Sequence, residues 1–555
     1  MNDKINYEPV SNDKAHLKNV AEWEASKVIT PEIMETARKI LLRVIDGADV
    51  FKTIRANPVP KHGNISKDAL VKAYREMVAN GEIQEDPHLL AKIRMKPNRT
   101  LSGVSTVTVL TRPFPCPGNC IFCPNDARMP KSYLPDEPGA ARAFQNHFDP
   151  FAQVRSRLDT YQALGHPTDK VELLILGGSW TSYPEDYQAW FVQRCLDAMN
   201  ESDSESLLIA QQQNETAAHR NVGLVVETRP DEITESNLKY LRKLGVTKIQ
   251  IGIQSLDDEI LNLNRRGHTV QQALEASKLC RAAGFKLVMH WMPNLLGSTP
   301  QSDREDFMRL WVEADQGLGF CPDELKIYPT QLVENSDLYE VWRAGKYLPY
   351  DTETLIDLIA GIKPFIPPYC RVNRIIRDIP SHHIVAGNTR SSLRMDIHQR
   401  MAENGTRCNC IRCREIRDQA VDPTTLKLVD YSYHAAEAEE HFLQFVTPED
   451  KIAGYLRLSL PTRSSPNLDI ADLNEAAIIR EIHVYGQELP VGMELKGAAQ
   501  HAGLGKKLIN KAIQIAKNNN FKKLAVISAI GTRKYYESRG FSRGEYYMVM
   551  DLTNK

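Results

Sequence analysis

The stretch Pro115-Cys-Pro-Gly-Asn-Cys-Ile-Phe-Cys-Pro-Asn125 contains three cysteines, Cys116, Cys120 and Cys123, in the spacing C-x3-C-x2-C. Three thiolates are one fewer than a tetrahedral structural metal site takes from a protein. A [4Fe-4S] cluster that is held by three cysteines leaves one iron open to another ligand. The alternative is a zinc knuckle with a remote fourth ligand. Phe122 and the proline and glycine residues of the stretch favour a cluster loop, and we predict a [4Fe-4S] cluster here.

The open iron gives this motif a specific chemistry. S-adenosylmethionine (SAM) can chelate such an iron through its amino and carboxylate groups. An electron from the cluster then splits the sulfonium and releases a 5′-deoxyadenosyl radical, while the protein mainly positions the reacting groups. The spacing is the radical-SAM signature, so it predicts SAM as a cofactor.

Short apolar segments alternate with longer amphipathic segments from about residue 100 to residue 390. The candidate strands are 106–110, 172–176, 222–227, 248–253, 286–289 and 324–327. Repeated strand-then-helix units predict a parallel sheet. About six such units would form a partial, open (β/α) barrel rather than a closed barrel of eight. The carboxyl ends of the strands are then expected to face the active site.

Polar and glycine residues follow three of these candidate strands. Gly177 and Gly178 come directly after a buried strand, where glycine lets the backbone approach a ligand closely. We predict that they bind the methionine end of SAM; the alternative is a simple turn. Glu227 could accept hydrogen bonds from the ribose hydroxyls and Arg229 could pair with a carboxylate, or the two could form a surface ion pair. Gln254 occupies the equivalent place on the next strand.

A second group of cysteines, Cys408, Cys410 and Cys413, falls within six residues. A structural zinc is the simplest explanation for three thiolates so close together. The fourth ligand is open between His398 and Cys370. A second iron–sulfur cluster is the alternative.

A basic segment lies just before the second cysteine group. Its arginines are opposed by one acid, Asp378, within the same span. They are Arg371, Arg374, Arg377, Arg390 and Arg394. This segment is predicted to contact phosphates of a nucleic acid; the alternative is a solvated face whose ion pairs come from elsewhere in the chain. The net charge of the whole chain is −1, so a polyanionic partner would have to be bound by local basic surface.

The C-terminal part of the chain contains a glycine pair, Gly503 and Gly505, at the start of an amphipathic segment. Glycines there leave backbone N–H groups free at a helix N-terminus, where a pyrophosphate can bind. The pattern Q-x-x-G-x-G is similar to the coenzyme A loop of acetyltransferases, and the segment 526–541 fits the end of such a domain. Tyr535 and Tyr536 could merely pack, but we favour Tyr536 as the residue that reaches the thioester.

The composition and length of the chain indicate its broad class and its division into domains. The 555 residues are 42% hydrophobic and 25% charged, which suits several globular domains. No apolar run approaches the roughly 18 residues of a membrane span, and clustered cysteines favour metal sites in a reducing compartment, hence a soluble cytoplasmic protein. We predict a helical N-terminal region (1–95, beginning a helix at Thr30-Pro31), a barrel (96–390), a Cys-rich metal-binding linker (391–425) and an acetyltransferase-like domain (426–555). The polar stretch within 202–214 is predicted to be a mobile loop.

These features, in this order, resemble the catalytic subunit of Elongator and its stand-alone bacterial and archaeal relatives. The resemblance extends from residue 99 to residue 548 and rests on the cysteine stretch together with Arg266-Gly-His-Thr269, Arg377-Asp-Ile-Pro380, Glu481-Ile-His-Val-Tyr-Gly486 and Gly531-Thr-Arg533. It implies an α/β protein with a partial radical-SAM barrel, a Cys-rich linker and a GNAT-type acetyltransferase domain. Ala502 departs from the family, which often has a basic residue in the coenzyme loop.

The resemblance also implies an activity. Members of this family place a carboxymethyl group on carbon 5 of the wobble uridine in tRNA anticodons. They use a SAM-derived radical, which takes a methyl hydrogen from acetyl-CoA. The residues that the resemblance assigns to acetyl-CoA are Lys170, Ile482, His483, Val484, Tyr485, Gly503, Gly505, Lys506, Lys507 and Tyr536. Lys170 and Tyr536 would be the catalytic residues among them, and the anticodon stem-loop of tRNA would be the partner.

Two other functions remain open at this point. One is a protein lysine acetyltransferase with a regulatory radical-SAM domain. The other is a tRNA-binding module whose cluster is structural. Of the three functions, only the carboxymethylation of tRNA requires SAM turnover that depends on tRNA.

Overall fold

The computed structural model describes residues 29–60, 62–95, 103–417, 421–485 and 503–553. The chain divides into two compact units. The first contains Met1–Pro97 and Thr160–His166, and the second contains Asn98–Asp159 and Pro167–Lys555. No helix within the described ranges combines the length and the apolar character that crossing a membrane would require.

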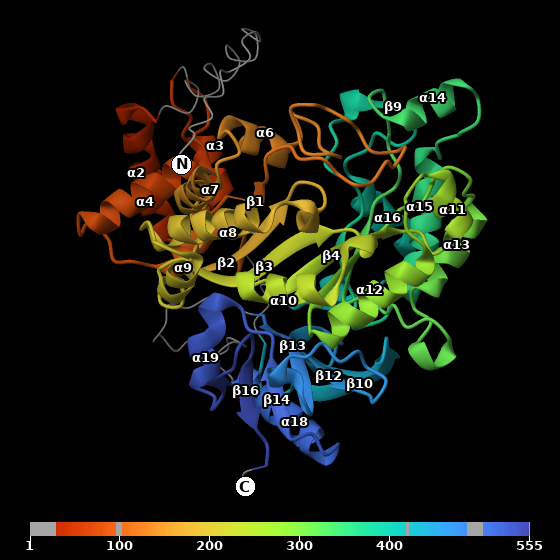
Figure 1. Ribbon diagram of the computed structural model, residues 1–555. Coiled ribbons are helices and arrows are strands. Elements are labelled where there is room, and N and C mark those ends of the chain that lie inside the picture. The colour runs from red at the N-terminus through yellow and green to blue at the C-terminus, as the bar shows by residue number, and fades with distance from the viewer. Residues whose placement is uncertain (1–28, 61, 96–102, 418–420, 486–502, 554–555) are drawn as a thin grey trace. The chain divides into compact units, whose positions relative to one another are not determined.

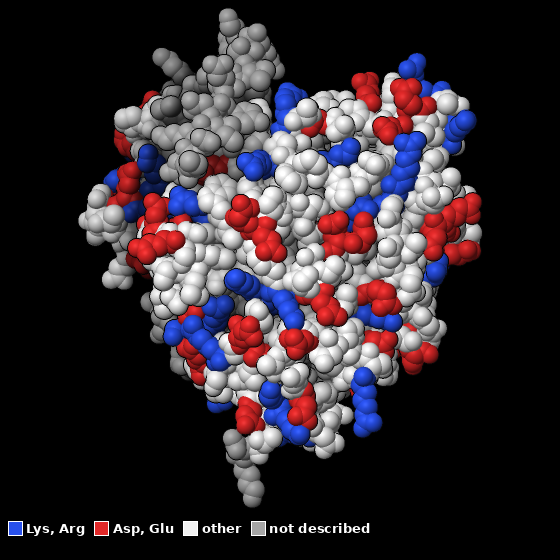
Figure 2. Space-filling view, in the orientation of Figure 1, with Lys and Arg blue, Asp and Glu red and all other residues white. Residues whose placement is uncertain are grey.

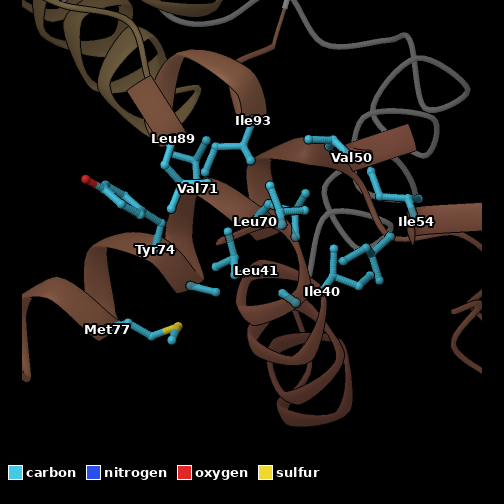
Figure 3. Close-up of a cluster of buried hydrophobic side chains, with 14 of the residues drawn as sticks. Ile40, Leu41, Val50, Ile54, Leu70, Val71, Tyr74, Met77, Leu89 and Ile93 are labelled. Atoms are coloured by element: carbon cyan, nitrogen blue, oxygen red, sulfur yellow. The ribbon is translucent and has the colours of Figure 1, made fainter. Parts of the chain in front are cut away.

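The first unit is helical, as the sequence predicts. It contains α2 (Pro31–Ile45), α3 (Val50–Ala56), α4 (Lys67–Ala79) and α5 (Pro87–Ile93). The predicted start at Thr30 is confirmed, because its hydroxyl accepts a hydrogen bond from Ile33 N at 3.3 Å. Figure 3 shows the core of this unit, in which Leu41 of α2, Leu70 of α4 and Ile93 of α5 converge.

The second unit begins with a sheet of seven parallel strands. Their order is β1-β2-β3-β4-β5-β6-β8. The bounds are β1 (Ser105–Leu110), β2 (Lys170–Leu176), β3 (Arg220–Thr228), β4 (Lys248–Gln254), β5 (Lys286–Trp291), β6 (Glu324–Ile327) and β8 (Arg371–Arg374). Within the described residues β1 and β8 each pair with one neighbour, so the barrel is open. The predicted partial barrel and its six strands are confirmed.

The seventh strand, β8, is a difference from the sequence analysis. Its four residues, Arg371-Val-Asn-Arg374, are mostly polar and carry no apolar run. Only Val372 is fully buried. Backbone pairing with β6 makes this segment a strand, which its composition does not signal.

Helices connect the parallel strands, as Figure 1 shows. They are α6 (Pro138–Gln145), α7 (Pro150–Ala163), α8 (Glu185–Asn200), α9 (Leu207–Asn214), α10 (Glu235–Leu244), α11 (Asp258–Leu263), α12 (Val270–Ala282), α13 (Pro300–Arg309), α14 (Asp337–Arg343) and α15 (Thr352–Ile362). A short pair, β7 (Leu332–Val333) and β9 (Ile384–Ala386), is antiparallel.

The predicted mobile loop within 202–214 is wrong. Most of its second half is the helix α9, which Ser206 caps by accepting from Ile209 N. Asn214 is completely buried, donates to His219 O at 3.0 Å and accepts from Asn221 N at 2.7 Å. The polar side chains of this stretch therefore bind backbone groups inside the protein instead of water.

A second sheet follows the linker helices α16 (Leu393–Glu403) and α17 (Ile411–Arg414). Its order is β10-β11-β12-β13-β14-β16-β15. The bounds are β10 (Lys427–Ala435), β11 (Ala438–Val446), β12 (Ile452–Pro461), β13 (Ala476–Val484), β14 (Lys523–Val526), β15 (Ser542–Arg543) and β16 (Met548–Asp551), with helices α18 (Leu504–Asn518) and α19 (Arg533–Glu537). β13 and β14 are parallel and pair only as far as Ile479 with Val526.

The second sheet packs against the amino ends of the barrel strands. Lys286, the first residue of β5, forms an ion pair with Glu481 of β13. Asp323, just before β6, accepts hydrogen bonds from Arg480 Nη1 at 2.8 Å and Nη2 at 2.6 Å. Burial alone would raise the pKa of the Glu481 carboxyl, but Lys286 and Arg457 lower it to about 2. This amino edge of the first sheet is thus a buried, fully charged junction.

Candidate active site

The three cysteines of the first motif lie at the opposite, carboxyl edge of the barrel sheet. Their loop is fixed by backbone hydrogen bonds, from Ile121 N to Asn264 O (3.2 Å) and from Leu338 N to Ile121 O (2.8 Å). Cys120 is buried in an apolar cluster with residues such as Leu295 and Leu332. Cys116 and Cys123 are half-buried. The loop is therefore held rigidly while two of its thiols remain accessible.

The electrostatic environment of Cys120 suits a metal ligand. A hydrogen bond with Cys123, together with the nearby guanidinium groups of Arg266 and Arg229, lowers the pKa of the Cys120 thiol to about 5. The Nη1 atoms of Arg266 and Arg229 lie 3.2 and 3.9 Å from Cys120 Sγ. Thiolate is the form that binds iron. The residues present therefore fit an iron–sulfur cluster.

The turn after β2 has a backbone conformation that favours glycine. Gly177 and Gly178 have φ values of 136° and 93°. A Cβ on Gly177 would lie 1.8 Å from Oγ1 of Thr111, whereas a Cβ on Gly178 would meet nothing within 4 Å. Packing against Thr111 thus explains the first glycine. The second lies beside open space, as a ligand-binding role requires.

The other predicted SAM residues lie at the same edge. Gln254 is buried with φ 67°, and its Oε1 has no hydrogen-bond partner within the described structure. Glu227 Oε1 is 3.5 Å from His290 Nδ1. Arg229 pairs with a carboxylate of the protein itself, because its Nε and Nη2 atoms donate to Asp231. Gln254 therefore offers a free acceptor, while Arg229 is already paired.

Sequence reasoning did not assign a role to two side chains of this edge. His290, near the end of β5, donates from Nε2 to Gln250 Oε1 (3.1 Å), and burial lowers its pKa well below the usual range. Arg266 was noticed only as part of a family motif. The sequence pattern could have pointed to His290, because it lies two residues after Val288 and therefore on the same face of the strand.

The predicted acetyl-CoA residues separate into two groups. Ile482 and Val484 lie on the face of β13 that meets α18, because a Cβ on Gly505 would be 3.8 and 3.9 Å from their methyl groups. Glu481, His483 and Tyr485 share the opposite face, where Tyr485 Oη accepts from Arg371 Nη1 at 3.0 Å. Burial lowers the pKa of His483 to about 4, so this imidazole is neutral near pH 7.

The loop at the start of α18 is partly described. Gly503 has φ 67° and precedes the helix, and Lys506 and Lys507 are exposed in its first turn. Gln500 and Ala502 lie outside the described residues. The loop therefore has the exposed helix start and the basic side chains that a pyrophosphate requires.

The two tyrosines of α19 differ in exposure. Tyr536 is buried and packs against Phe541, with ring centroids 5.7 Å apart, and burial raises its pKa. Tyr535 is 37% exposed. Its Oη is the atom that a Cβ on Gly505 would meet, at 2.9 Å. Tyr535 is thus the tyrosine whose hydroxyl reaches the glycine loop, and the catalytic role of Tyr536 stays a prediction.

Lys170 lies at the amino edge, beside the acetyltransferase sheet. It is the first residue of β2 and pairs with Arg220. Arg220 and Asn221 pack directly against Gly531, where a Cβ would be 2.6 Å from Arg220 Cβ. The Nζ atom of Lys170 is 4.0 Å from Asp169 Oδ2. The structure therefore brings Lys170 to the junction of the two sheets, and its contact with acetyl-CoA stays a prediction.

The second cysteine group converges on one point. The Sγ atoms of Cys408, Cys410 and Cys413 lie within 4.8 Å of one another, and the buried Lys363 Nζ is 3.4 Å from Cys408 Sγ. Of the two candidate fourth ligands, His398 lines the adjoining cavity of about 300 Å³. Cys370 is buried, and its carbonyl accepts from Ile411 N at 2.9 Å. The three thiols can hold one metal ion, and the fourth ligand stays open.

The predicted phosphate-binding arginines are mostly engaged within the protein. Arg371 pairs with Glu415 at 2.8 Å, Arg377 with Glu137 at 3.3 Å, and Arg394 donates to Asn373 O at 3.1 Å. Two others remain more exposed; Arg374 pairs with Asp378, and Arg390 lies 3.4 Å from Asp396. The acids that oppose these arginines come largely from outside the segment, so the available basic surface is smaller than the sequence suggests.

Charges are mixed on the surface as well. On the face that Figure 2 shows, the described basic and acidic side chains are interspersed. This face carries no extended field of one sign among them, in agreement with the net charge of −1.

Comparison with known proteins defines the family. Residues 115–310 match the Radical SAM superfamily, residues 322–403 the Radical_SAM C-terminal domain, and residues 412–541 the Acetyltransferase (GNAT) family. The chain is 42% identical to the tRNA uridine(34) acetyltransferase of Dehalococcoides mccartyi over 82% of its own length and 99% of that protein. The chain belongs to the family of tRNA uridine(34) acetyltransferases.

Other members of the tRNA uridine(34) acetyltransferase family support this assignment. The protein of this name from Methanocaldococcus jannaschii is 37% identical and covers 94% of the chain and 99% of its own length. Elongator complex protein 3 of Homo sapiens is 33% identical, with coverages of 94% and 97%. A solved structure of archaeal Elp3 from Methanocaldococcus infernus, lacking residues 1–46, matches with a TM-score of 0.69 at 36% identity, over 81% of this chain and 99% of that one.

Family membership confirms the predicted fold class and fixes the kind of chemistry. The chain is an enzyme that combines a radical-SAM half-barrel with a GNAT-type acetyltransferase domain. The first domain implies SAM and an iron–sulfur cluster, and the second implies acetyl-CoA.

Proposed function

We propose that the protein carboxymethylates carbon 5 of the wobble uridine of tRNA, with acetyl-CoA as the source of the two carbons and SAM as the source of the radical. The names of its relatives refer to uridine 34 of tRNA. The observation that carries the proposal is that one compact unit contains both sites. The three-cysteine loop lies at the carboxyl edge of the barrel sheet, and the acetyltransferase sheet packs on its amino edge.

At the carboxyl edge, Cys116, Cys120 and Cys123 would hold a [4Fe-4S] cluster with one open iron. When bound, this cluster supplies the electron that cleaves SAM. Gln254 offers an unpaired amide oxygen to the ligand, and Gly178 leaves space for it.

At the acetyltransferase sheet, β13 pairs with β14 only as far as Ile479. We propose that the segment beyond this point, Ile482 to Tyr485, binds the pantetheine arm of acetyl-CoA. Gly503 to Lys507 would bind its pyrophosphate. The neutral His483 and the hydroxyl of Tyr535 or Tyr536 are the groups that could hold or move a proton near the thioester.

The remaining groups would bind structural metal and RNA. Zinc at Cys408, Cys410 and Cys413 would fix the linker between the two sheets. The exposed arginines, Arg374 and Arg390, would contact phosphates of the anticodon stem-loop. The uridine would have to leave its stack to be modified.

Mass spectrometry of nucleosides tests the proposal. Anaerobically reconstituted protein, tRNA, SAM, a reductant and acetyl-CoA labelled with ¹³C in both acetyl carbons should yield 5-carboxymethyluridine that carries both labels. Cys120→Ala should abolish the product. Cys280→Ala, a buried cysteine outside both groups, is the matched control and should retain it. Labelled protein lysine without labelled tRNA would contradict the proposal.

A further inference from the structure

Arg266 stands out as a buried cation at the cluster loop. Only 6% of its surface is exposed. Its Nη1 atom donates to Cys120 Sγ at 3.2 Å, and Nη2 donates to the carbonyl of Gly252 in β4. The guanidinium is thus held between a strand of the barrel and a cysteine that we assign to the cluster.

Among the described residues, no carboxylate lies within ion-pair distance of Arg266. Two nearby arginines differ from Arg266, because each of them pairs with a carboxylate. Arg265, adjacent in sequence, is exposed and pairs with Asp337 at 3.3 Å. Arg229, the other guanidinium near Cys120, pairs with Asp231 at 2.9 Å. An uncompensated buried charge costs several kcal/mol. Instead of a carboxylate, the side chain that Arg266 contacts is Cys120, whose Sγ lies 3.2 Å from Nη1, so this buried cation faces the cluster loop.

The chain makes room for both guanidinium groups with glycine. A Cβ on Gly252 would lie 2.7 Å from Arg266 Nη2. A Cβ on Gly118, inside the cysteine stretch, would lie 2.2 Å from Arg229 Nη1. Real Cβ atoms do not approach other atoms this closely. The backbone on both sides is therefore adapted to the arginines, which is unexpected for chance surface contacts.

We propose that Arg266 is a positioning residue that acts through Cys120: it is the counter-ion of the cluster and raises its reduction potential. The proposal rests on the iron–sulfur site of the proposed function. Reduction adds one electron, from a low-potential one-electron donor, and makes the cluster more negative. A fixed positive charge with a hydrogen bond to a ligand sulfur stabilises that reduced form. No proton moves, because the guanidinium stays charged throughout.

The test is the midpoint potential of the reconstituted protein, followed by EPR during titration with dithionite. Arg266→Gln removes the charge, Arg266→Lys keeps it, and Arg265→Gln is the matched control one residue away. We expect the reduced-to-oxidised ratio at a fixed potential to fall about tenfold in Arg266→Gln, a downward shift of about 59 mV for one electron. Arg266→Lys should shift less, and Arg265→Gln should not shift.

Several outcomes would overturn the proposal. A midpoint unchanged in Arg266→Gln, at an iron content equal to that of the unaltered protein, means that the arginine does not act on the cluster. If Arg266→Gln does not fold, Gly252→Ala replaces it. This change keeps the arginine but displaces it from Cys120, and it should also lower the midpoint; an unchanged midpoint would again contradict the proposal.

The same experiment separates this inference from the function on which it rests. If the unaltered protein forms no four-iron signal, or a signal that SAM does not perturb, the proposed function fails. If the unaltered protein gives a SAM-sensitive signal and the Arg266 variants titrate identically, only the role of Arg266 fails.

Discussion

The two edges of the barrel sheet carry buried charge in different ways. At the amino edge, every charge described here has a partner of opposite sign. Asp323 meets Arg480, and Lys286 meets Glu481. At the carboxyl edge, Arg266 is buried without a carboxylate among the described residues, and the Gln254 amide oxygen has no partner. Ion pairs across the amino edge hold the two sheets together, whereas the buried Arg266 and Gln254 of the carboxyl edge face the site that we assign to the cluster and SAM.

The largest expected effect comes from breaking the amino edge. Asp323→Asn removes the carboxylate that meets Arg480, Arg457 and Arg281, all fully buried. Removing one partner of a buried pair leaves uncompensated charge, which costs about 3–5 kcal/mol. Denaturation by urea, followed by circular dichroism, should show this loss. Asp315→Asn, an exposed acid near His434, is the control and should change stability by less than about 1 kcal/mol. Equal urea midpoints for Asp323→Asn and Asp315→Asn would contradict a stabilising role of the buried ion pairs at the amino edge.

Acid should weaken the same edge through Glu481. Its pKa, about 2 in the folded protein, is below the 4.5 of a free glutamate, because Lys286 and Arg457 outweigh burial. The folded state therefore gains stability above pH 4.5 and loses it as the pH falls from about 4.5 to about 2. The urea midpoint of the unaltered protein should decline over this range. In Glu481→Gln the midpoint should be lower at pH 7 and should decline less on acidification; parallel declines would show that Glu481 does not contribute.

A change at the carboxyl edge should affect ligand binding and spare stability. Gln254→Ala removes the unpaired amide and is expected to weaken SAM binding about tenfold, as loss of one hydrogen bond worth about 1.4 kcal/mol would. Isothermal titration of reconstituted protein measures it. Gln271→Ala, whose exposed side chain donates to Glu275, is the control. A lower urea midpoint with unchanged SAM affinity would reverse the distinction between the edges.

The smallest effect is expected at the exposed arginines beside the carboxyl edge. Arg374→Gln should weaken tRNA binding severalfold and reduce the slope of log affinity against log salt by about one, because one phosphate contact is lost. Filter binding over a range of salt concentrations tests this. Arg377 is engaged with Ser132 and Glu137, so Arg377→Gln should lower stability more than it lowers tRNA affinity. A salt slope unchanged in Arg374→Gln would remove this residue from the interface.

The sequence predicts the regular parts of the fold well. The six strands from β1 to β6 have apolar runs of the right length, and Thr30 caps its helix as expected. Local patterns suffice where one segment determines its own structure. β8 and α9 were missed because polar residues there are stabilised by partners distant in sequence, such as Glu415 for Arg371 and the carbonyl of Lys243 for Gln211.

The candidate site was predictable in its motifs and not in its charge pairing. The cysteines and the glycines after β2 are visible as spacing. Nothing in the spacing shows that Arg371 binds Glu415 and Tyr485, or that Arg266 reaches Cys120. Such contacts join residues that are more than 40 positions apart in the sequence. Only the three-dimensional arrangement distinguishes an arginine that can bind RNA from one that is already neutralised.

The charged junction between the two sheets has a consequence for dissecting the protein. Cutting the chain near residue 425 would expose Arg457, Arg480 and Glu481 on one fragment and Asp323 and Lys286 on the other. Each fragment would then expose charged side chains whose partners of opposite sign lie on the other fragment. Neither half is expected to fold as an autonomous module. Exchanging one half between relatives would therefore require exchanging the charged residues on both sides of the junction together.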